Sequence, residues 1–257
     1  MSPHLDDAVF SVGGALAALS DAGWRVQVVT CFTATVADPS PFALSTQLDK
    51  GLPADADYMA LRRAEDHAAC AVLGAEPIHL PFPEAPHRGY RSAPELFAGV
   101  RTDDGIGAAL RAALRQSVAA ADVVLAPQAL GGHTDHRIVA ETVADLTDAA
   151  LWWRDVPYVR RAPHEEPWRI VPRGRDLAFP IGAQLARKIE AVRCYTTQLG
   201  FQFGGSAEVA RVLRELAGAE ALRSGVVGQV EPLRCPRDDV ASRLPVTVSV
   251  SSPRGGF

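Results

Sequence analysis

Hydrophobic and polar residues change period several times along the first two-thirds of the chain. Apolar residues recur at helical spacing in four segments, at residues 8–22, 58–73, 105–121 and 135–150. Short runs rich in β-branched or apolar residues lie between them, at residues 26–30, 78–80 and 122–126. Strand and helix in alternation predict a parallel sheet with helices on both faces, so we expect an α/β protein.

The pattern differs in the last third. Residues 151–180 hold several prolines and aromatic residues and predict short strands and turns. Further helix-like and then strand-like segments follow, at residues 181–195, 206–216, 226–233 and 246–250. We expect one integrated domain over residues 1–257, with residues 1–150 as the parallel core and residues 151–257 as a C-terminal extension.

Two long segments show neither period. Residues 33–57 are rich in Asp, Pro, Ser and Thr, and residues 81–100 contain several prolines. Structureless segments of this length in a compact domain are usually functional or mobile. We therefore expect both to contact a ligand, with His87, Arg88 and Tyr90 as candidate contacts in the second.

Composition and charge exclude several classes of protein. The 257 residues are 47% hydrophobic and 22% charged, enough for a large buried core. A formal net charge of −4 with scattered arginines argues against a nucleic-acid partner. The sequence predicts no membrane span and no export signal. Four widely spaced cysteines are typical of free thiols in a reducing compartment, so we expect a soluble cytoplasmic protein.

Two short clusters combine histidine with carboxylates. Residues 2–7 read Ser-Pro-His-Leu-Asp-Asp, and residues 131–136 read Gly-Gly-His-Thr-Asp-His. Each cluster stands where a strand should lead into a helix. In open parallel sheets the ligand crevice lies outside the carboxyl ends of the strands. We therefore expect the two clusters to face each other at one edge of the sheet.

These residue types suit an open zinc site, which uses three imidazole or carboxylate ligands and leaves one position for water. Asp6 and Asp7 are adjacent and cannot both point at one metal from a regular backbone. One can bind it while the other reaches the water. His133 and His136 are three residues apart, so one can bind the metal while the other stands beside a substrate. Asp135 could orient a histidine nitrogen.

The segment Pro3-His4-Leu5-Asp6-Asp7, followed by His133-Thr134-Asp135-His136, resembles the paired signature of the PIG-L/LmbE family of N-deacetylases. The resemblance extends over about residues 1–200. It implies a zinc-dependent hydrolase that removes an N-acyl group from an amino sugar, such as one in a secondary metabolite or a thiol-cofactor precursor. It fits a Rossmann-like three-layer sandwich with a mostly parallel central sheet and a smaller C-terminal β/α extension. The expected partner is this small-molecule substrate, and the oligomeric state, a homo-oligomer included, is left open.

The resemblance also implies a role for each matching residue. His4, Asp7 and His136 become the zinc ligands, and Asp6 the general base. His133 becomes a protonated partner of the reacting oxygen, oriented by Asp135. The segment Arg62-Arg63-Ala64-Glu65 resembles an Arg-x-x-Glu helix near the family's substrate, although a solvated helix face explains it equally well.

Two departures from the family pattern are visible. Many members have Tyr where this chain has Gly131, so a hydroxyl that polarises the carbonyl would come from elsewhere, with Tyr90 and Tyr195 as candidates. The family's first strand also runs for several residues before Pro-His, whereas only Met1-Ser2 precedes Pro3. Either this strand is unusually short or upstream residues are absent from the sequence.

Three alternatives remain open at this point. Residues 11–15, Ser-Val-Gly-Gly-Ala, superficially suggest a glycine-rich turn of a nucleotide-binding Rossmann-type protein, but the Gly-x-Gly-x-x-Gly spacing is absent and close helix packing explains the glycines better. A binding protein with a relict site is a second alternative. The third is an amidase acting on a non-sugar conjugate.

Overall fold

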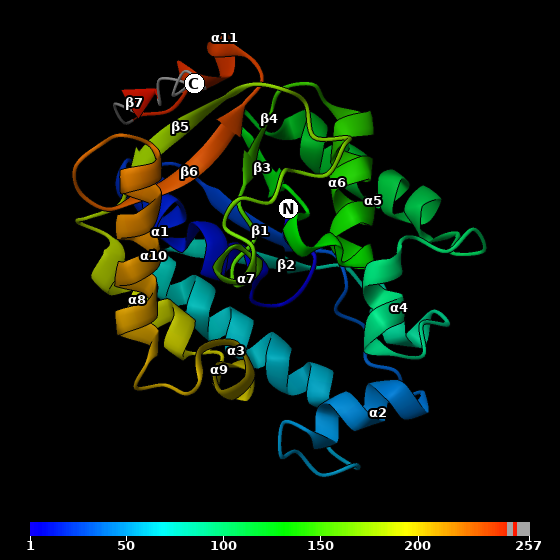
Figure 1. Cartoon of the computed structure of the whole chain (residues 1–257). Helices are drawn as coiled ribbons and strands as arrows, with labels where there is room; N and C mark the ends of the chain where they lie inside the picture. Colours follow the sequence, from blue (N-terminus) through cyan, green and yellow to red (C-terminus); the bar gives the residue numbers. More distant parts are fainter. Residues whose placement is uncertain (246–248, 251–257) are drawn as a thin grey trace.

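The computed structural model describes residues 1–245 and 249–250. Helices cover both sides of the strands (Figure 1). The larger helical layer contains α1 (Asp7–Asp21), α3 (Tyr58–Leu73), α8 (Leu185–Arg193), α9 (Thr196–Phe203) and α10 (Val209–Arg223). The opposite layer contains α5 (Ile106–Ala120) and α6 (Thr134–Leu146). The expected α/β class is confirmed.

The strands form two groups that differ in direction. In the first, β1 (Val26–Thr30) pairs in parallel with β2 (Ala75–His79). The second group has the order β3-β4-β6-β5-β7, with strands β3 (Val124–Pro127), β4 (Ala150–Trp153), β6 (Val230–Cys235), β5 (Arg175–Pro180) and β7 (Ser249–Val250). Only β3 and β4 are parallel there; the pairings of β6 with β4 and β5, and of β5 with β7, are antiparallel. The expected mostly parallel central sheet is therefore not confirmed, because the last third of the chain returns through antiparallel strands.

Strand β4 shows how one strand serves both helical layers. Leu151 and Trp153 pack into the cluster that contains α1, α3, α8 and α10. Ala150 and Trp152 point the other way, into the cluster that contains α5 and α6. All four side chains are almost completely buried. Burial on both faces explains why this strand is a continuous apolar run instead of an alternating one.

The start of the chain lies between β1 and β3. Ser2 pairs in parallel with Thr30, and the amino group of Met1 donates to the carbonyl of Leu125 over 2.5 Å. A cavity of about 300 Å³ lies beside this segment, lined by residues of β1, β3, α1 and the end of α5. The two residues before Pro3 are thus held by a β-bridge to β1 on one side and by a hydrogen bond to β3 on the other.

The loop-like segments contain short helices that the sequence pattern did not predict. Helix α2 (Pro41–Leu48) lies in the segment 33–57, and its N-terminus is capped by Ser40. The segment 81–100 contains η1 (Ala85–His87) and α4 (Ala93–Ala98). Three further short helices are η2 (Leu130–Gly132), α7 (Tyr158–Arg161) and α11 (Asp238–Ala241). The expected run at 246–250 lies partly outside the described residues.

The glycines near the start of α1 serve helix packing. A Cβ at Gly14 would lie 2.7 Å from Ile181, so α1 approaches that residue closely. The backbone N–H groups of Gly14 and Ala15 donate to the carboxylate of Glu231, which also pairs with Lys188 over 2.6 Å. These N–H groups are therefore not free for a phosphate, which argues against the nucleotide-binding alternative.

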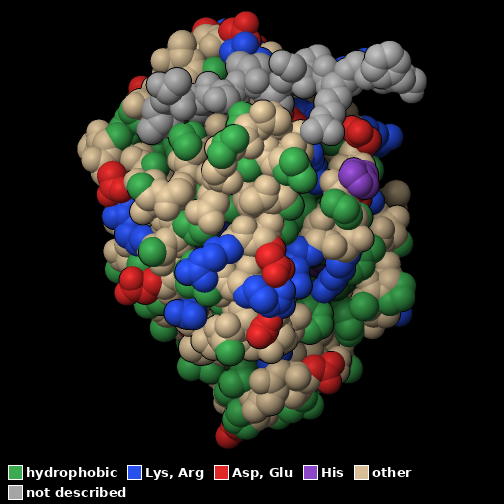
Figure 2. Space-filling view, turned by 60° about the vertical axis from the view of Figure 1, so that its left-hand side comes forward, with side chains coloured by type: hydrophobic (Ala, Val, Ile, Leu, Met, Phe, Trp, Pro, Cys, Tyr) green, Lys and Arg blue, Asp and Glu red, His purple; other side chains and the backbone are tan. Residues whose placement is uncertain are grey.

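Charged residues of both signs share the face on which α8 and α10 lie. Figure 2 shows Lys and Arg side chains gathered in the middle of this face with Asp and Glu among them. On α10, Arg211 pairs with Glu208 and Glu215. No helix in the described part of the chain is long and apolar enough to cross a bilayer.

Candidate functional site

A tight turn places the first cluster at the start of α1. The hydroxyl of Ser2 donates to the carbonyl of His4 over 2.7 Å and accepts from the backbone N–H of Ala8. Asp6 has a φ of 153°, a conformation that side-chain-bearing residues rarely adopt. Such strain persists where the surrounding contacts fix the backbone, and it is common at functional sites. The turn brings the side chains of His4 and Asp7 together.

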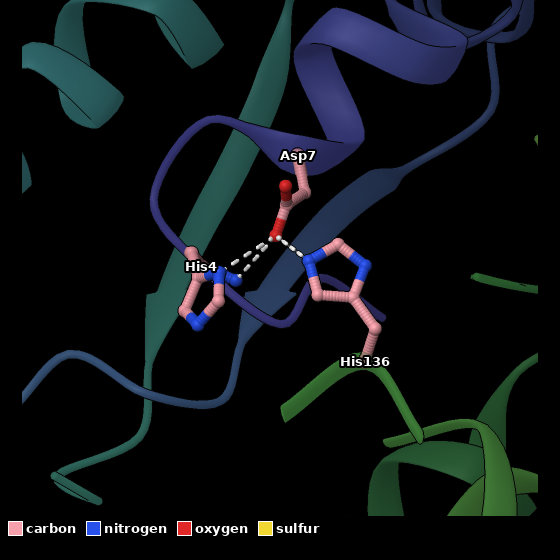
Figure 3. Close-up of side chains that lie close together, drawn as sticks. All are labelled: His4, Asp7 and His136. Carbon is pink, nitrogen blue, oxygen red and sulfur yellow. Dashed lines mark hydrogen bonds and ion pairs between the residues drawn. The ribbon is translucent and has the colours of Figure 1, made fainter. Parts of the chain in front are cut away.

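Three side chains from both predicted clusters converge on one point (Figure 3). Oδ2 of Asp7 lies 3.2 Å from Nδ1 of His4 and 3.2 Å from Nε2 of His136. One ligand atom from each of the three residues lies within 4.8 Å of the others. Two imidazoles and a carboxylate at this separation could hold a metal ion such as zinc.

His136 is oriented by a carboxylate that the sequence pattern did not reveal. Nδ1 of His136 bonds to Oδ1 of Asp155 over 2.6 Å, and the other oxygen of Asp155 accepts from the backbone N–H of Leu130. Because a carboxylate accepts, Nδ1 carries the proton and Nε2 offers its lone pair. Nε2 is buried, lies 3.2 Å from Oδ2 of Asp7 and forms no hydrogen bond with any residue that the structure describes. Asp155 comes directly after β4, which is parallel to β3, so it lies at the same edge of the sheet as the residues that follow β3. A carboxylate at this position in the sequence could have indicated a contact with His136.

Asp135 holds a different histidine from the one expected. Its Oδ2 lies 2.9 Å from Nε2 of His4 and also accepts from the backbone N–H of Ala85. Its Oδ1 accepts from Arg88 over 2.6 Å. No hydrogen bond joins the Asp135 carboxylate to His133 in the described part of the chain. The expected orientation of His133 by that carboxylate is therefore corrected: it orients His4.

The surroundings of His133 favour its neutral form over the protonated form that the family resemblance implies. Its Nδ1 accepts from the backbone N–H of Asp135, so the neutral ring carries its proton on Nε2. Burial, with His4 and His136 nearby, lowers the pKa of His133 to about 3. A metal ion beside it would lower this pKa further. His133 can still donate a hydrogen bond through Nε2–H.

Asp6 is buried beside the three converging side chains. Burial and the neighbouring Asp7 raise the pKa of Asp6 to about 7, although Arg62 opposes the rise. The Arg62 guanidinium lies 3.6 Å from Oδ1 of Asp6. A carboxylate with a pKa near neutrality suits a group that takes and returns a proton.

The two adjacent arginines of α3 have different surroundings. Arg62 is 5% exposed and donates to Glu84 and to the carbonyl of Leu5. It therefore stabilises the turn before α1, and its guanidinium is engaged within the protein. Arg63 donates to the carbonyl of Thr33 and to the hydroxyl of Thr35. Both arginines thus have partners within the protein.

Arg88 and Tyr90 are engaged behind the site. Arg88 donates to Asp135 and Asp104 and lies over the ring of Phe32. Tyr90 is 1% exposed, and its hydroxyl donates to Asp104. Both groups thus hold the surroundings of Asp135, and their expected contacts with a substrate stay a prediction.

Tyr195 is also excluded as a free hydroxyl. It is completely buried and its hydroxyl donates to Asp66 over 2.6 Å. His87 differs from these residues, since it is half-buried and lines a cavity of about 220 Å³. Residues 35–59 form most of the wall of this cavity, and Glu84, the partner of Arg62, lies in it as well. The cavity thus connects the segment 33–57 with the vicinity of Asp6.

Several known proteins with related sequences or structures are deacetylases. A family model described as PIG-L, GlcNAc-PI de-N-acetylase, matches residues 1–147. The 2′-N-acetylparomamine deacetylase of Streptomyces fradiae is 31% identical over 210 residues, covering 77% of this chain and 72% of that protein. The solved A40926 pseudoaglycone deacetylase has a TM-score of 0.75 and 30% identity, covering 91% of this chain and 94% of its own. A deacetylase of teicoplanin biosynthesis has a TM-score of 0.77 and 25% identity, covering 98% and 97%.

Proposed function

Because this chain belongs to the PIG-L family, we propose that it is a zinc-dependent hydrolase that removes an N-acetyl group from an amino sugar of an antibiotic-type metabolite. The substrate class rests on the relatives. Two of them are named for 2′-N-acetylparomamine and for the pseudoaglycone of the antimicrobial reagent A40926.

One observation carries the metal requirement. Nε2 of His136 is buried, forms no hydrogen bond with a described residue and lies 3.2 Å from Oδ2 of Asp7, while Asp155 holds the opposite nitrogen. With the ring proton on Nδ1, two lone pairs face each other across this gap, which is unfavourable unless a cation lies between them. We assign His4, Asp7 and His136 as the zinc ligands. Zinc bound there would polarise the acyl carbonyl and lower the pKa of an attacking water.

The protein's own groups would manage the protons of the reaction. The water oxygen attacks the acyl carbon, and Asp6 takes a proton from this water at the same time. The Nε2–H of His133 donates a hydrogen bond to the acyl oxygen as that oxygen gains negative charge. Asp6 then delivers the proton to the sugar nitrogen as the carbon–nitrogen bond breaks. The products are acetate and a free amine.

The proposed function is tested by measuring amine release and metal content on the same preparation. The substrates are N-acetylglucosamine, 2′-N-acetylparomamine and an N-acetylglucosaminyl glycopeptide. We expect about one zinc per chain, loss of activity after chelation and recovery when zinc is restored to one equivalent. Metal-free protein with full activity would contradict the metal requirement. No release from any substrate would contradict the amino-sugar assignment.

We expect Asp155→Asn to weaken zinc binding about 10–100-fold, the usual effect of losing a carboxylate that orients a metal-bound histidine. The amide offers one acceptor and one NH₂ group to two donors, the His136 ring and the Leu130 N–H. Competition with a chelating dye measures the affinity. The exposed Asp148→Asn is the matched control, and equal zinc affinity in both variants would remove Asp155 from this role.

We propose that the cavity lined by His87 admits part of the substrate. We therefore expect His87→Ala to raise KM roughly tenfold with little change in kcat, because His87 takes no part in the proposed proton transfers. Arg88→Ala should instead lower kcat, since its guanidinium supports Asp135. Steady-state kinetics with zinc-loaded protein separates the two. An unchanged KM in His87→Ala would show that this wall does not contact the substrate.

A further inference from the structure

One tyrosine hydroxyl near the site has no hydrogen-bond partner in the described part of the chain. The chain has four tyrosines. Three of their hydroxyls bond within the protein: Tyr58 to Gln198, Tyr90 to Asp104 and Tyr195 to Asp66. The hydroxyl of Tyr158 forms no hydrogen bond with any described residue, and it is not sealed from solvent. It is therefore free to bond to a ligand.

The ring of Tyr158 is fixed against the proposed metal ligands. It packs edge-on against His136, with ring centres 5.3 Å apart and an angle of 83° between the rings. Its other neighbour is Gly131, where a Cβ would lie only 2.3 Å from Cδ1 of the tyrosine. The ring thus fills the space above Gly131 that a side chain at that position would need. Its place is set by packing, independently of the hydroxyl.

The hydroxyl of Tyr158 can serve as a donor. A tyrosine has an ordinary pKa near 10, so its hydroxyl keeps its proton at neutral pH and can donate a hydrogen bond. The ionised carboxylate of Asp7, which faces the same histidine, only accepts and offers no donor to an oxygen that gains negative charge.

We propose that Tyr158 is a further catalytic residue, whose hydroxyl donates a hydrogen bond to the acyl oxygen in the tetrahedral state. The inference rests on the proposed function. His133 also packs against His136, with ring centres 5.5 Å apart. Two hydrogen-bond donors, the Tyr158 hydroxyl and the Nε2–H of His133, therefore belong to rings that contact His136. A developing oxyanion is stabilised by several donors held in place before the reaction. No covalent bond of Tyr158 breaks.

The test is Tyr158→Phe, which keeps the ring packing and removes only the hydroxyl. We expect kcat to fall about 10²-fold, the usual effect of removing one oxyanion donor, with KM and zinc content near those of the parent. Affinity for a methylphosphonate analogue of the substrate, a mimic of the tetrahedral state, should fall in proportion to kcat/KM. Affinity for the amine product should not change. A purely structural role would not produce this split.

Tyr195→Phe is the matched control, since it removes a hydroxyl that bonds to Asp66 inside the protein. It should lower the melting temperature and leave kcat near the parent value. Parent-like kcat and analogue affinity in Tyr158→Phe would overturn the role of Tyr158 alone. No turnover by the zinc-loaded parent would overturn the proposed function, and the role of Tyr158 with it.

Discussion

His136→Ala should leave the protein largely free of zinc and reduce deacetylation to background. The substitution removes one of the three converging ligand atoms, on the ring whose other nitrogen is fixed by Asp155. An open zinc site needs three protein ligands, and the remaining pair, His4 and Asp7, would bind the ion weakly. Metal analysis and amine release on purified protein measure both effects.

Two further variants make this result interpretable. His136 is completely buried, so its loss leaves Oδ1 of Asp155 without its partner and would lower stability by itself. The side chain of His4 is 14% exposed, so His4→Ala tests the same ligand set with less damage to the core. His164→Ala changes an exposed histidine and should retain zinc and activity. Full zinc in both His4→Ala and His136→Ala would remove these residues from the ligand set.

Local periodicity predicted the elements of the first half closely. The run at 26–30 and the helical spacing at 58–73 coincide with β1 and α3, because β1 is buried on both faces and α3 on one. The direction of later strands was not predictable in this way. Strand β6 pairs antiparallel with both β4 and β5, and such pairing depends on contacts far apart in sequence. The local pattern of apolar residues therefore does not predict which strands pair or in which direction.

The site shows the same division between short motifs and distant partners. The motifs predicted that His4, Asp7 and His136 would meet, and the structure brings them together. They did not predict which carboxylate supports which histidine. Asp155 follows β4 and Asp135 starts α6, so their distances from the two rings depend on how α6 packs beside the strands.

Arg88 and Tyr90 illustrate a third difficulty. Charged and aromatic residues in a proline-rich segment suggested ligand contacts. In the fold these side chains meet Asp104 and Asp135 and are buried by them. A polar side chain in a loop can equally bind a substrate or satisfy a buried carboxylate. Which of the two it does can be told only from the residues that it contacts in the fold.

The neighbouring aspartates Asp6 and Asp7 should respond differently to the same substitution. Asp7→Asn should weaken zinc binding, because a neutral amide is a much poorer ligand for a divalent cation than a carboxylate, and both ligand histidines face Oδ2 of Asp7. Asp6→Asn should keep its zinc, because Asp6 is not in the converging set of ligand atoms. Metal analysis of the two variants, prepared in parallel, measures the difference, and each serves as the other's control.

Asp6→Asn should nevertheless lose roughly 10²–10⁴-fold in kcat, the usual contribution of a positioned general base. Its melting temperature should not fall, because the carboxylate is buried beside Asp7 and the neutral amide removes that repulsion. Arg62 keeps its bond to Glu84 in this variant, so the turn stays supported. Kinetics, zinc content and thermal unfolding together decide the assignment. Near-normal turnover in Asp6→Asn, or equal zinc loss in both variants, would contradict the separate roles proposed for the two carboxylates.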